Sequence, residues 1–349
     1  MDRMNRDQFY AAMAGLNEER LRKALWNLYW RGAAPVRERI EAEIAPPEAR
    51  PRSRDQAAAV DPEVVLHEVR EFIALARSGA YMAGDRRVSR TERSRWRFTF
   101  RRHLADSRQA LLTSAGDPDS AALVAILDFA SDLRDYDYFH TEDAVEAAGL
   151  VVSDEVALLW GRVLRRSGFP EFAKVAAPQL VRWESLYGWT RSGYGKVAAK
   201  ETMLSDVLET MLPVPDAWIT FADYYLTALD EVVDPALPAS SWRSRDRLLD
   251  ERSAALARWH QMLLERFIDT DSEGLLDRVA THPALGGPEL IFFQARLAQG
   301  RGDADRAADL IRDCLSKLPG HQGFINFAQE IGATLPENAQ RIAAQRRGG

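Results

Sequence analysis

Apolar residues recur at spacings of three and four along nearly the whole chain, which is the pattern of amphipathic α-helices. The stretch 18–31 is typical, because Leu21, Leu25 and Leu28 fall on one helical face together with Ala24 and Tyr29. Runs of Val, Ile and Thr with a period of two, which mark half-buried strands, are missing. The pattern therefore predicts an all-α protein with no sheet of consequence.

Capping and helix-breaking residues place the ends of the expected helices. Asn17 is the expected N-cap of the helix 18–31, which should end at Gly32. Asp61-Pro62-Glu63 marks another start, with proline at the first helical position. Signals of this kind predict helices at about residues 5–15, 18–31, 35–44, 61–78, 90–114, 117–134, 141–149, 153–167, 170–187, 197–212, 215–233, 243–269, 272–281, 288–300, 304–318, 321–332 and 336–346.

A segment rich in proline and charge separates the first helices from the rest. Residues 45–54 contain no bulky hydrophobic side chain, which favours a linker. We therefore expect an N-terminal helical unit at 1–44, a Pro/Arg-rich linker at 45–60 and a helical body at 61–349. Many short helices joined by short turns indicate that the body is an irregular α-solenoid or an array of helical hairpins.

One hairpin of the body carries a more specific pattern. Within residues 288–319, large apolar residues stand at Ile291 and Ile311, and a proline ends the segment at Pro319. Small residues stand at Ala295, Ala307 and Cys314. This segment resembles a tetratricopeptide repeat, although Gln294 and Ala298 stand where leucine and tyrosine are usual. A weaker echo lies at 158–180. The resemblance implies a helical-hairpin superstructure in the C-terminal part, without a regular array of identical repeats.

The composition fits a folded chain without an exported or membrane-spanning segment. Its 349 residues are 46% hydrophobic, which is enough for a sizeable core, and no run of eighteen or more apolar residues occurs. The first residues lead into a mixed helical pattern instead of an apolar signal sequence. Cys314 is the only cysteine, which excludes an internal disulfide and suits a reducing compartment. A cytoplasmic protein with no membrane partner is therefore expected.

Charge is distributed unevenly. The net charge is -6, but residues 1–110 contain 22 Lys and Arg against 16 Asp and Glu, whereas the remainder contains 24 against 36. Only five of the 46 basic residues are lysine, so arginine is enriched throughout, as expected from a GC-rich genome. Residues 86–102 nevertheless contain eight arginines, about four times the average for this chain. Such a cluster indicates a surface that attracts acidic partners.

Helical spacing divides this cluster into two faces. Ser89 and Glu92 fit a capping box, so a helix should begin near Arg90. Trp96, Phe100, Leu104 and Leu111 would then form an apolar core face. The candidate binding residues lie outside that face; they are Arg86, Arg90, Arg93, Arg97 and Arg101. This stripe could pair internally or be solvated, could bind an acidic protein partner, or could neutralise the phosphates of a nucleic acid.

The segment 135–143, Asp-Tyr-Asp-Tyr-Phe-His-Thr-Glu-Asp, concentrates carboxylates around a histidine. Asp135, Asp137 and His140 are weak candidates for metal ligands, because oxygen and imidazole donors suit several divalent ions. Their spacing matches neither a calcium-binding loop nor a helical pair of histidines. The interleaved aromatic residues favour a structured acidic loop, which could dock on an arginine-bearing face.

Local signatures of catalysis or cofactor binding are missing from the sequence. Residues 193–198 fit G-x-G-x-x-A, but a dinucleotide site requires a preceding strand, which this sequence does not predict; Lys196 could still hold an anion at a helix start. The six histidines are at least twenty residues apart. We therefore expect no cofactor, and we expect a binding protein instead of an enzyme, although an active site assembled from distant residues stays open.

Two of the nine tryptophans do not fit a core role. Trp26 and Trp30 lie one turn apart beside a face that leucines already fill, so they could dock the small N-terminal unit on the body or on another subunit. The sequence as a whole predicts a non-enzymatic scaffold or adaptor module that binds an acidic or peptide-like protein partner. The alternative is a nucleic-acid-associated regulator that uses the arginine stripe. The oligomeric state stays undetermined.

Overall fold

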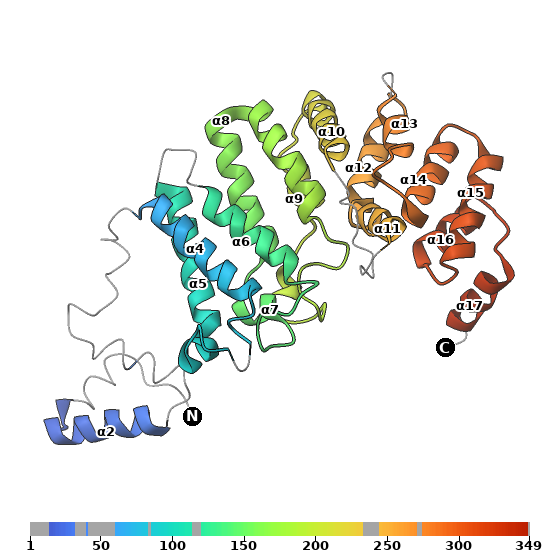
Figure 1. Ribbon diagram of the computed structural model, residues 1–349. Helices are drawn as coiled ribbons and strands as arrows, with labels where there is room; N and C mark the ends of the chain where they lie inside the picture. The colour runs from blue at the N-terminus through green and yellow to red at the C-terminus, as the bar shows by residue number, and fades with distance from the viewer. Residues whose placement is uncertain are drawn as a thin grey trace. The chain divides into compact units, whose positions relative to one another are not determined.

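The computed structural model describes residues 14–31, 40, 60–82, 85–113, 120–232, 244–270 and 274–347. Regular structure within these ranges is entirely helical (Figure 1), which confirms the all-α class predicted from the periodicity. The chain divides into two compact units, Met1–Ala59 and Val60–Gly349. Within the described ranges, no helix is long and apolar enough to cross a lipid bilayer.

The described helix of the first unit is α2 (Glu18–Arg31), which has the bounds predicted for it. Its N-cap is Asn17, whose side-chain oxygen accepts a hydrogen bond of 2.9 Å from the Arg20 amide. No residue of α2 is buried. The predicted helices at 5–15 and 35–44 and the predicted linker at 45–60 lie, apart from a few residues, outside the described part of the chain.

The second unit is a succession of helices that pack both against consecutive helices and against helices further along the chain (Figure 1). Its described elements are α4 (Pro62–Arg77), α5 (Arg90–Thr113), α6 (Ala121–Asp132), α7 (Ala144–Ala148), α8 (Val152–Trp183), the 3-10 turn η3 (Ala198–Lys200), α9 (Leu204–Glu209), α10 (Pro215–Asp230), α11 (Arg245–Ala255), α12 (Ala257–Phe267), α13 (Leu275–Ala280), α14 (Gly287–Gly300), α15 (Ala304–Lys317), α16 (Gln322–Glu330) and α17 (Glu337–Arg347).

Local capping explains where several of these helices begin. α4 follows Asp61, whose carboxylate accepts a hydrogen bond from the Glu63 amide, and Pro62 occupies its first position. α5 begins with the expected capping box. The Glu92 amide donates to the Ser89 hydroxyl at 3.2 Å, and the Ser89 amide donates to the Glu92 carboxylate at 3.0 Å.

Two predicted helices differ from the structure because tertiary contacts override the local pattern. The predicted helix 197–212 is replaced by η3 and the shorter α9, because Glu201 takes an extended backbone conformation between them. Its carboxylate accepts hydrogen bonds from the amides of Val152 and Ser153, the first residues of α8. The predicted helix 243–269 is divided into α11 and α12 at Leu256, which is fully buried and leaves helical geometry.

The break predicted between residues 167 and 170 is present as a kink. α8 is assigned as one helix, but Gly168 has φ 76° and ψ 177°, a conformation that side-chain-bearing residues avoid. The end of α8 comes earlier than predicted, at Trp183. Glu184 follows it, and its buried carboxylate accepts hydrogen bonds from the Leu204 and Ser205 amides at the start of α9.

Two hydrophobic cores fill the described second unit, and α14 belongs to both. The larger core extends from Val65 to Leu297 and is rich in aromatic side chains. The smaller one extends from Ala295 to Ala339 and lies among α14, α15, α16 and α17. Four tryptophans expected in the core are fully buried in the larger one; they are Trp160, Trp183, Trp218 and Trp259.

α14 and α15 form the hairpin that resembles a tetratricopeptide repeat. They pack closely along their lengths and are joined by a short turn in which Gly302 has φ 82°. Four positions of the repeat pattern are fully buried, and the large apolar position at Ile291 is half-buried. The four are Ala295, Ala307, Ile311 and Cys314. The hairpin is thus present, while membership of the repeat family and a solenoid arrangement remain predictions.

Candidate functional site

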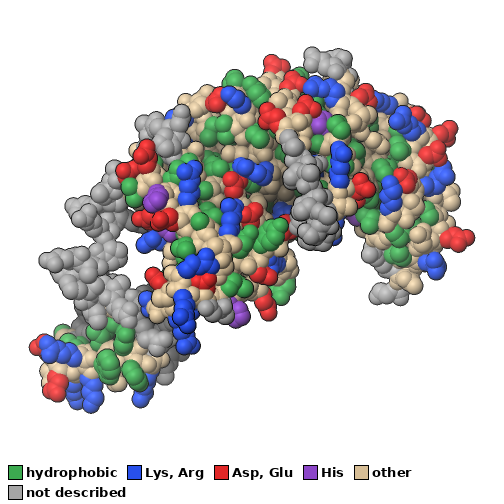
Figure 2. Space-filling model, in the orientation of Figure 1, with side chains coloured by type: hydrophobic (Ala, Val, Ile, Leu, Met, Phe, Trp, Pro, Cys, Tyr) green, Lys and Arg blue, Asp and Glu red, His purple; other side chains and the backbone are tan. Residues whose placement is uncertain are grey.

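The arginine-rich helix α5 has the two faces that its spacing predicts. Trp96, Phe100, Leu104 and Leu111 are buried against the rest of the second unit. Arg90, Arg97 and Arg101 are exposed and Arg93 is half-buried. Figure 2 shows basic side chains gathered over the N-terminal end of α5.

The acidic loop 135–143 docks beside this end of α5 through its aromatic residues. Phe139 is buried and stacks on Trp96 with ring centroids 3.9 Å apart and planes at 13°. It also contacts Phe72, Tyr81 and Phe129. The loop is therefore a structured element pinned by an aromatic anchor, and its neighbour is the arginine-bearing helix.

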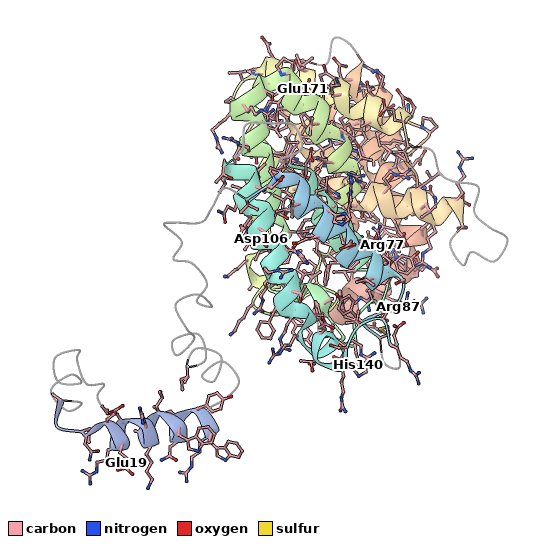
Figure 3. All side chains as sticks on the ribbon, turned by 60° about the vertical axis from the view of Figure 1, so that its left-hand side comes forward. Glu19, Arg77, Arg87, Asp106, His140 and Glu171 are labelled. Carbon is pink, nitrogen blue, oxygen red and sulfur yellow. The ribbon has the colours of Figure 1, made fainter. Side chains whose placement is uncertain are left out.

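A hollow of about 510 Å³ lies between α5 and this loop. Its wall contains three guanidinium groups together with hydroxyl, imidazole, aromatic and small apolar side chains. The lining residues are Tyr81, Arg90, Arg93, Ser94, Trp96, Arg97, His140, Thr141 and Ala147. No carboxylate is among them, and we refer to this feature as the arginine hollow. Figure 3 shows His140 and Arg87 at this end of the second unit.

Two arginines of the predicted stripe are held by backbone carbonyl groups. Arg93 donates through Nη1 to the Asp85 carbonyl. Arg101 donates through Nε to the Ala148 carbonyl at 2.7 Å and through Nη2 to the Ala147 carbonyl at 3.0 Å. Arg101 therefore caps the C-terminal end of α7, where carbonyl groups lack helical partners. It serves the fold and does not line the arginine hollow.

Arg86, Arg90 and Arg97 have no ion pair with a carboxylate in the described part of the chain. Arg97 lies over the Phe98 ring, with its guanidinium carbon 5.0 Å from the centroid. Two acidic side chains at this end of α5 are already engaged. Asp85 pairs with Arg87, whose hydrogen bonds lower the pKa of that carboxyl to about 2, and Glu92 caps α5. The described residues thus leave Arg90 and Arg97 without a carboxylate partner, while the Asp85 carboxylate interacts electrostatically with Arg93 as well as with Arg87.

The metal candidates of the loop are not brought together. Asp137 forms an ion pair with Arg191 from the segment that follows α8, while His140 lies on the wall shared by the arginine hollow and a second hollow of about 640 Å³. The Asp135 amide donates to the Asp132 carbonyl at the end of α6. Across the described ranges, no three His, Cys, Asp or Glu side chains are placed to hold a metal ion.

The glycine-rich turn at 193–198 does hold an anion, and that anion belongs to the chain. The amides of Lys196 and Val197 each donate to the Glu146 carboxylate at 2.9 Å. A Cβ atom at Gly195 would lie 2.5 Å from that carboxylate, so only glycine fits there. Glu146 occupies the position that an external anion would take at Lys196.

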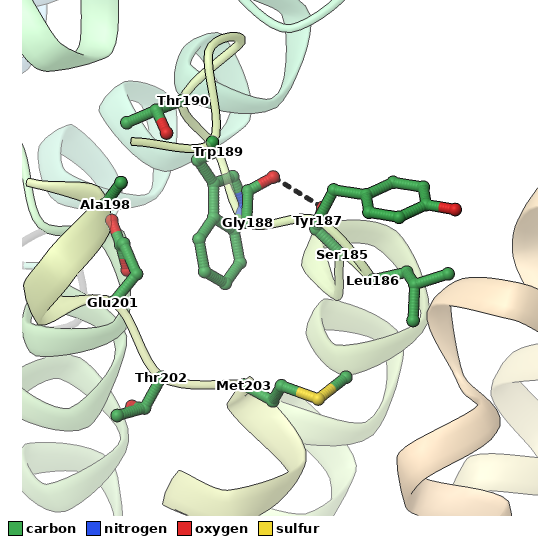
Figure 4. Close-up of a pocket in the computed structure, with 11 residues that line it drawn as sticks. Ser185, Leu186, Tyr187, Gly188, Trp189, Thr190, Ala198, Glu201, Thr202 and Met203 are labelled. Atoms are coloured by element: carbon green, nitrogen blue, oxygen red, sulfur yellow. Dashed lines mark hydrogen bonds between the residues drawn. The ribbon is translucent and has the colours of Figure 1, made fainter. Parts of the chain in front are cut away.

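A smaller cavity of about 200 Å³ lies beneath the segment between α8 and α9 (Figure 4). Figure 4 shows Trp189 and Thr190 on one side of it, Glu201 on a second side and Met203 facing Thr190 across it. Burial raises the pKa of the Glu201 carboxyl, although two α8 amides stabilise its charged form. Because the Glu201 carboxylate already caps α8, it is not available to bind a ligand in this cavity.

Trp26 and Trp30 lie together on α2. Their side chains are 57% and 70% exposed, and their ring centroids are 5.7 Å apart in a stacked arrangement. The described residues therefore present an exposed aromatic pair, as a docking role requires.

Sequence reasoning missed the residues that complete the arginine hollow. Tyr81, Thr141 and Ala147 lie on three separate segments that only folding brings to α5, and none carries a local signal of binding. The pairing of Asp137 with Arg191 was also invisible, because 54 residues separate the two. The chain matches no protein-family model, no curated protein sequence and no solved structure.

Proposed function

We propose that this protein is a non-enzymatic interaction module that binds an acidic segment of a partner protein in the arginine hollow. One observation carries the proposal. Arg90, Arg93 and Arg97 line a single hollow whose wall contains no carboxylate. Guanidinium groups form bidentate, charge-assisted hydrogen bonds with carboxylate and phosphate groups, which makes them suited to such a partner.

Three titratable groups that are buried or half-buried in the described structure have structural tasks, which supports a binding function over a catalytic one. They are Glu184, Glu201 and His260. Glu184 and Glu201 cap helices. His260 lies 2.6 Å from the Tyr225 hydroxyl inside the core, where burial lowers its pKa to about 3. Such a histidine stays neutral near pH 7 and is shielded from any substrate in solution.

A protein partner fits this surface better than a nucleic acid. The rings of Tyr81 and Trp96, which line the hollow, are both buried and both contact Phe139, so neither is free to stack on a base. Residues 60–349 carry 35 Lys and Arg against 43 Asp and Glu, an excess of acidic groups that would repel an extended phosphate backbone. A short acidic segment needs only the local basic surface.

The proposal is tested with the full chain and a fluorescein-labelled peptide of about ten residues rich in Asp and Glu. Replacing Arg90 and Arg97 by Glu should weaken binding by about tenfold or more per position, because a charge-assisted hydrogen bond contributes about 1.5–3 kcal/mol. Arg95→Glu is the matched control, since Arg95 is exposed on α5 and does not line the hollow.

Fluorescence anisotropy gives the dissociation constants, and a peptide of Ser and Gly serves as the uncharged probe. Equal loss of binding in the Arg95→Glu control would show that net charge alone attracts the peptide, which contradicts a defined site. Tighter binding of single-stranded DNA than of the acidic peptide, dependent on Arg90 and Arg97, would favour the nucleic-acid alternative.

A further inference from the structure

The donor groups of the arginine hollow outnumber what a single carboxylate can accept. Arg90, Arg93 and Arg97 line the hollow together with Thr141 and His140, whereas the Ser94 hydroxyl already donates to the Thr91 carbonyl at 2.8 Å. A carboxylate has one negative charge and two oxygens. A phosphate monoester carries about -1.5 to -2 charges near pH 7 and has three strong acceptor oxygens. The phosphate therefore matches both the charge and the number of donors more closely.

The placement of the arginines along α5 also suits a compact dianion. Arg90, Arg93 and Arg97 follow the helical spacing of three and four residues, so their side chains leave the same face. Arg93 is fixed by its hydrogen bond to the Asp85 carbonyl, whereas Arg90 and Arg97 have no carboxylate partner in the described structure. One anchored and two available guanidinium groups can close around a group seated between them.

The rest of the wall fits the carbon portion of a modified side chain. Tyr81 and Trp96 line the hollow although only 8% and 6% of their surfaces are exposed, and Ala147 adds a small apolar side chain. The volume of about 510 Å³ exceeds that of a phosphate group and lies within the range of sites that hold small organic ligands. Space therefore remains for the residue that carries the phosphate and for its backbone.

We infer that the arginine hollow recognises a phosphorylated side chain of the partner segment. This inference rests on the proposed function, because it specifies the acidic group that the same hollow takes. The binding of the partner would then be controlled by a kinase and a phosphatase, since the unmodified hydroxyl carries no negative charge to pair with Arg90 and Arg97.

The test compares three labelled peptides, Glu-Glu-Ala-X-Ala-Glu-Glu, in which X is phosphoserine, serine or glutamate. With the full chain, the phosphoserine peptide should bind at least about tenfold more tightly than the glutamate peptide, a difference of about 1.4 kcal/mol. The Arg90→Glu and Arg97→Glu variants should abolish this preference, and Arg95→Glu should retain it. Thermal unfolding of each variant establishes that it is folded.

A second pair of variants separates geometry from charge. Arg90→Lys and Arg97→Lys keep the positive charge but lose the bidentate fork. They should reduce the preference for phosphoserine over glutamate by about threefold or more, while binding of the glutamate peptide changes little. An unchanged preference in the lysine variants would overturn recognition by the guanidinium forks.

The remaining outcomes distinguish the two proposals. Equal binding of the phosphoserine and glutamate peptides, with dependence on Arg90 and Arg97, would overturn the phosphate inference and leave the proposed function intact. Failure of all three peptides to bind would overturn both. If inorganic phosphate alone competes at the same concentration as the phosphoserine peptide, the ligand is a free phosphate and the inference of a phosphorylated partner is wrong.

Discussion

The buried His103 of α5 should make this protein sensitive to mild acid. Its side chain is 4% exposed, its ring lies 5.3 Å from the Phe72 ring, and its Nδ1 atom has no hydrogen-bond partner in the described structure. Burial, assisted by the nearby Arg102, lowers the pKa of His103 from 6.5 to about 4. The neutral imidazole is therefore the form that the fold accommodates.

The sign and size of the effect follow from that shift. In the unfolded chain His103 binds a proton at higher pH than in the folded chain, so its contribution to stability is complete above pH 6.5 and is lost as the pH falls toward 4. At about 1.36 kcal/mol per pKa unit, the loss in free energy of unfolding is about 2 kcal/mol at pH 5 and about 3 kcal/mol at pH 4.

Urea unfolding at pH 7 and pH 5, followed by circular dichroism, measures this contribution by comparison with His103→Leu. The variant should lose about 2 kcal/mol less than the parent over that interval, because leucine takes up no proton. His67→Gln is the matched control, since the His67 side chain is 73% exposed, and it should follow the parent. Equal pH dependence in the parent and His103→Leu would refute the reasoning.

Three further predictions concern the anchors of the second unit. Phe139→Ala should lower the free energy of unfolding by about 3–5 kcal/mol, measured in urea, because it leaves a cavity against Trp96. Arg101→Ala should cost about 1–3 kcal/mol in the same assay, because the Ala147 and Ala148 carbonyls lose their donor; no change would mean that water replaces the guanidinium. Cys314 should resist a thiol reagent at pH 8 and react fully in urea, because burial raises its pKa to about 12 and shields the sulfur; rapid labelling of the native protein would contradict this burial.

Helix periodicity and capping residues predicted most of the described fold. The capping box at Ser89 and Glu92 fixed the start of α5, and the spacing from Arg90 to Leu111 assigned its buried and exposed faces. Such signals act within a few residues of one another and depend little on the rest of the chain. They fail where a distant group changes the backbone, as at Glu201, whose carboxylate caps α8 and interrupts the helix predicted at 197–212.

The candidate site was predictable only in part for the same reason. The arginines are visible in the sequence because one helix carries them. The sequence does not show that Arg101 is used to cap α7. It did indicate that the aromatic residues of 135–143 hold a structured loop, but not that Phe139 is the one that stacks on Trp96. At the Gly193–Lys196 turn the sequence did show an anion-binding pattern. It could not show that the bound anion is Glu146 of the same chain, because 50 residues separate Glu146 from Lys196.

Because α14 contributes side chains to both hydrophobic cores, the second unit should unfold locally in parts. α15, α16 and α17 are held mainly by the smaller core, which buries fewer side chains than the larger one. Because local opening costs less where fewer apolar contacts are broken, these helices should unfold and refold as a separate cooperative segment while α4 to α13 stay intact. Amide hydrogen exchange should then be faster across α15–α17 than across α8 and α10. The arginine hollow, which lies in the larger core's part of the chain, would keep its shape through each such opening.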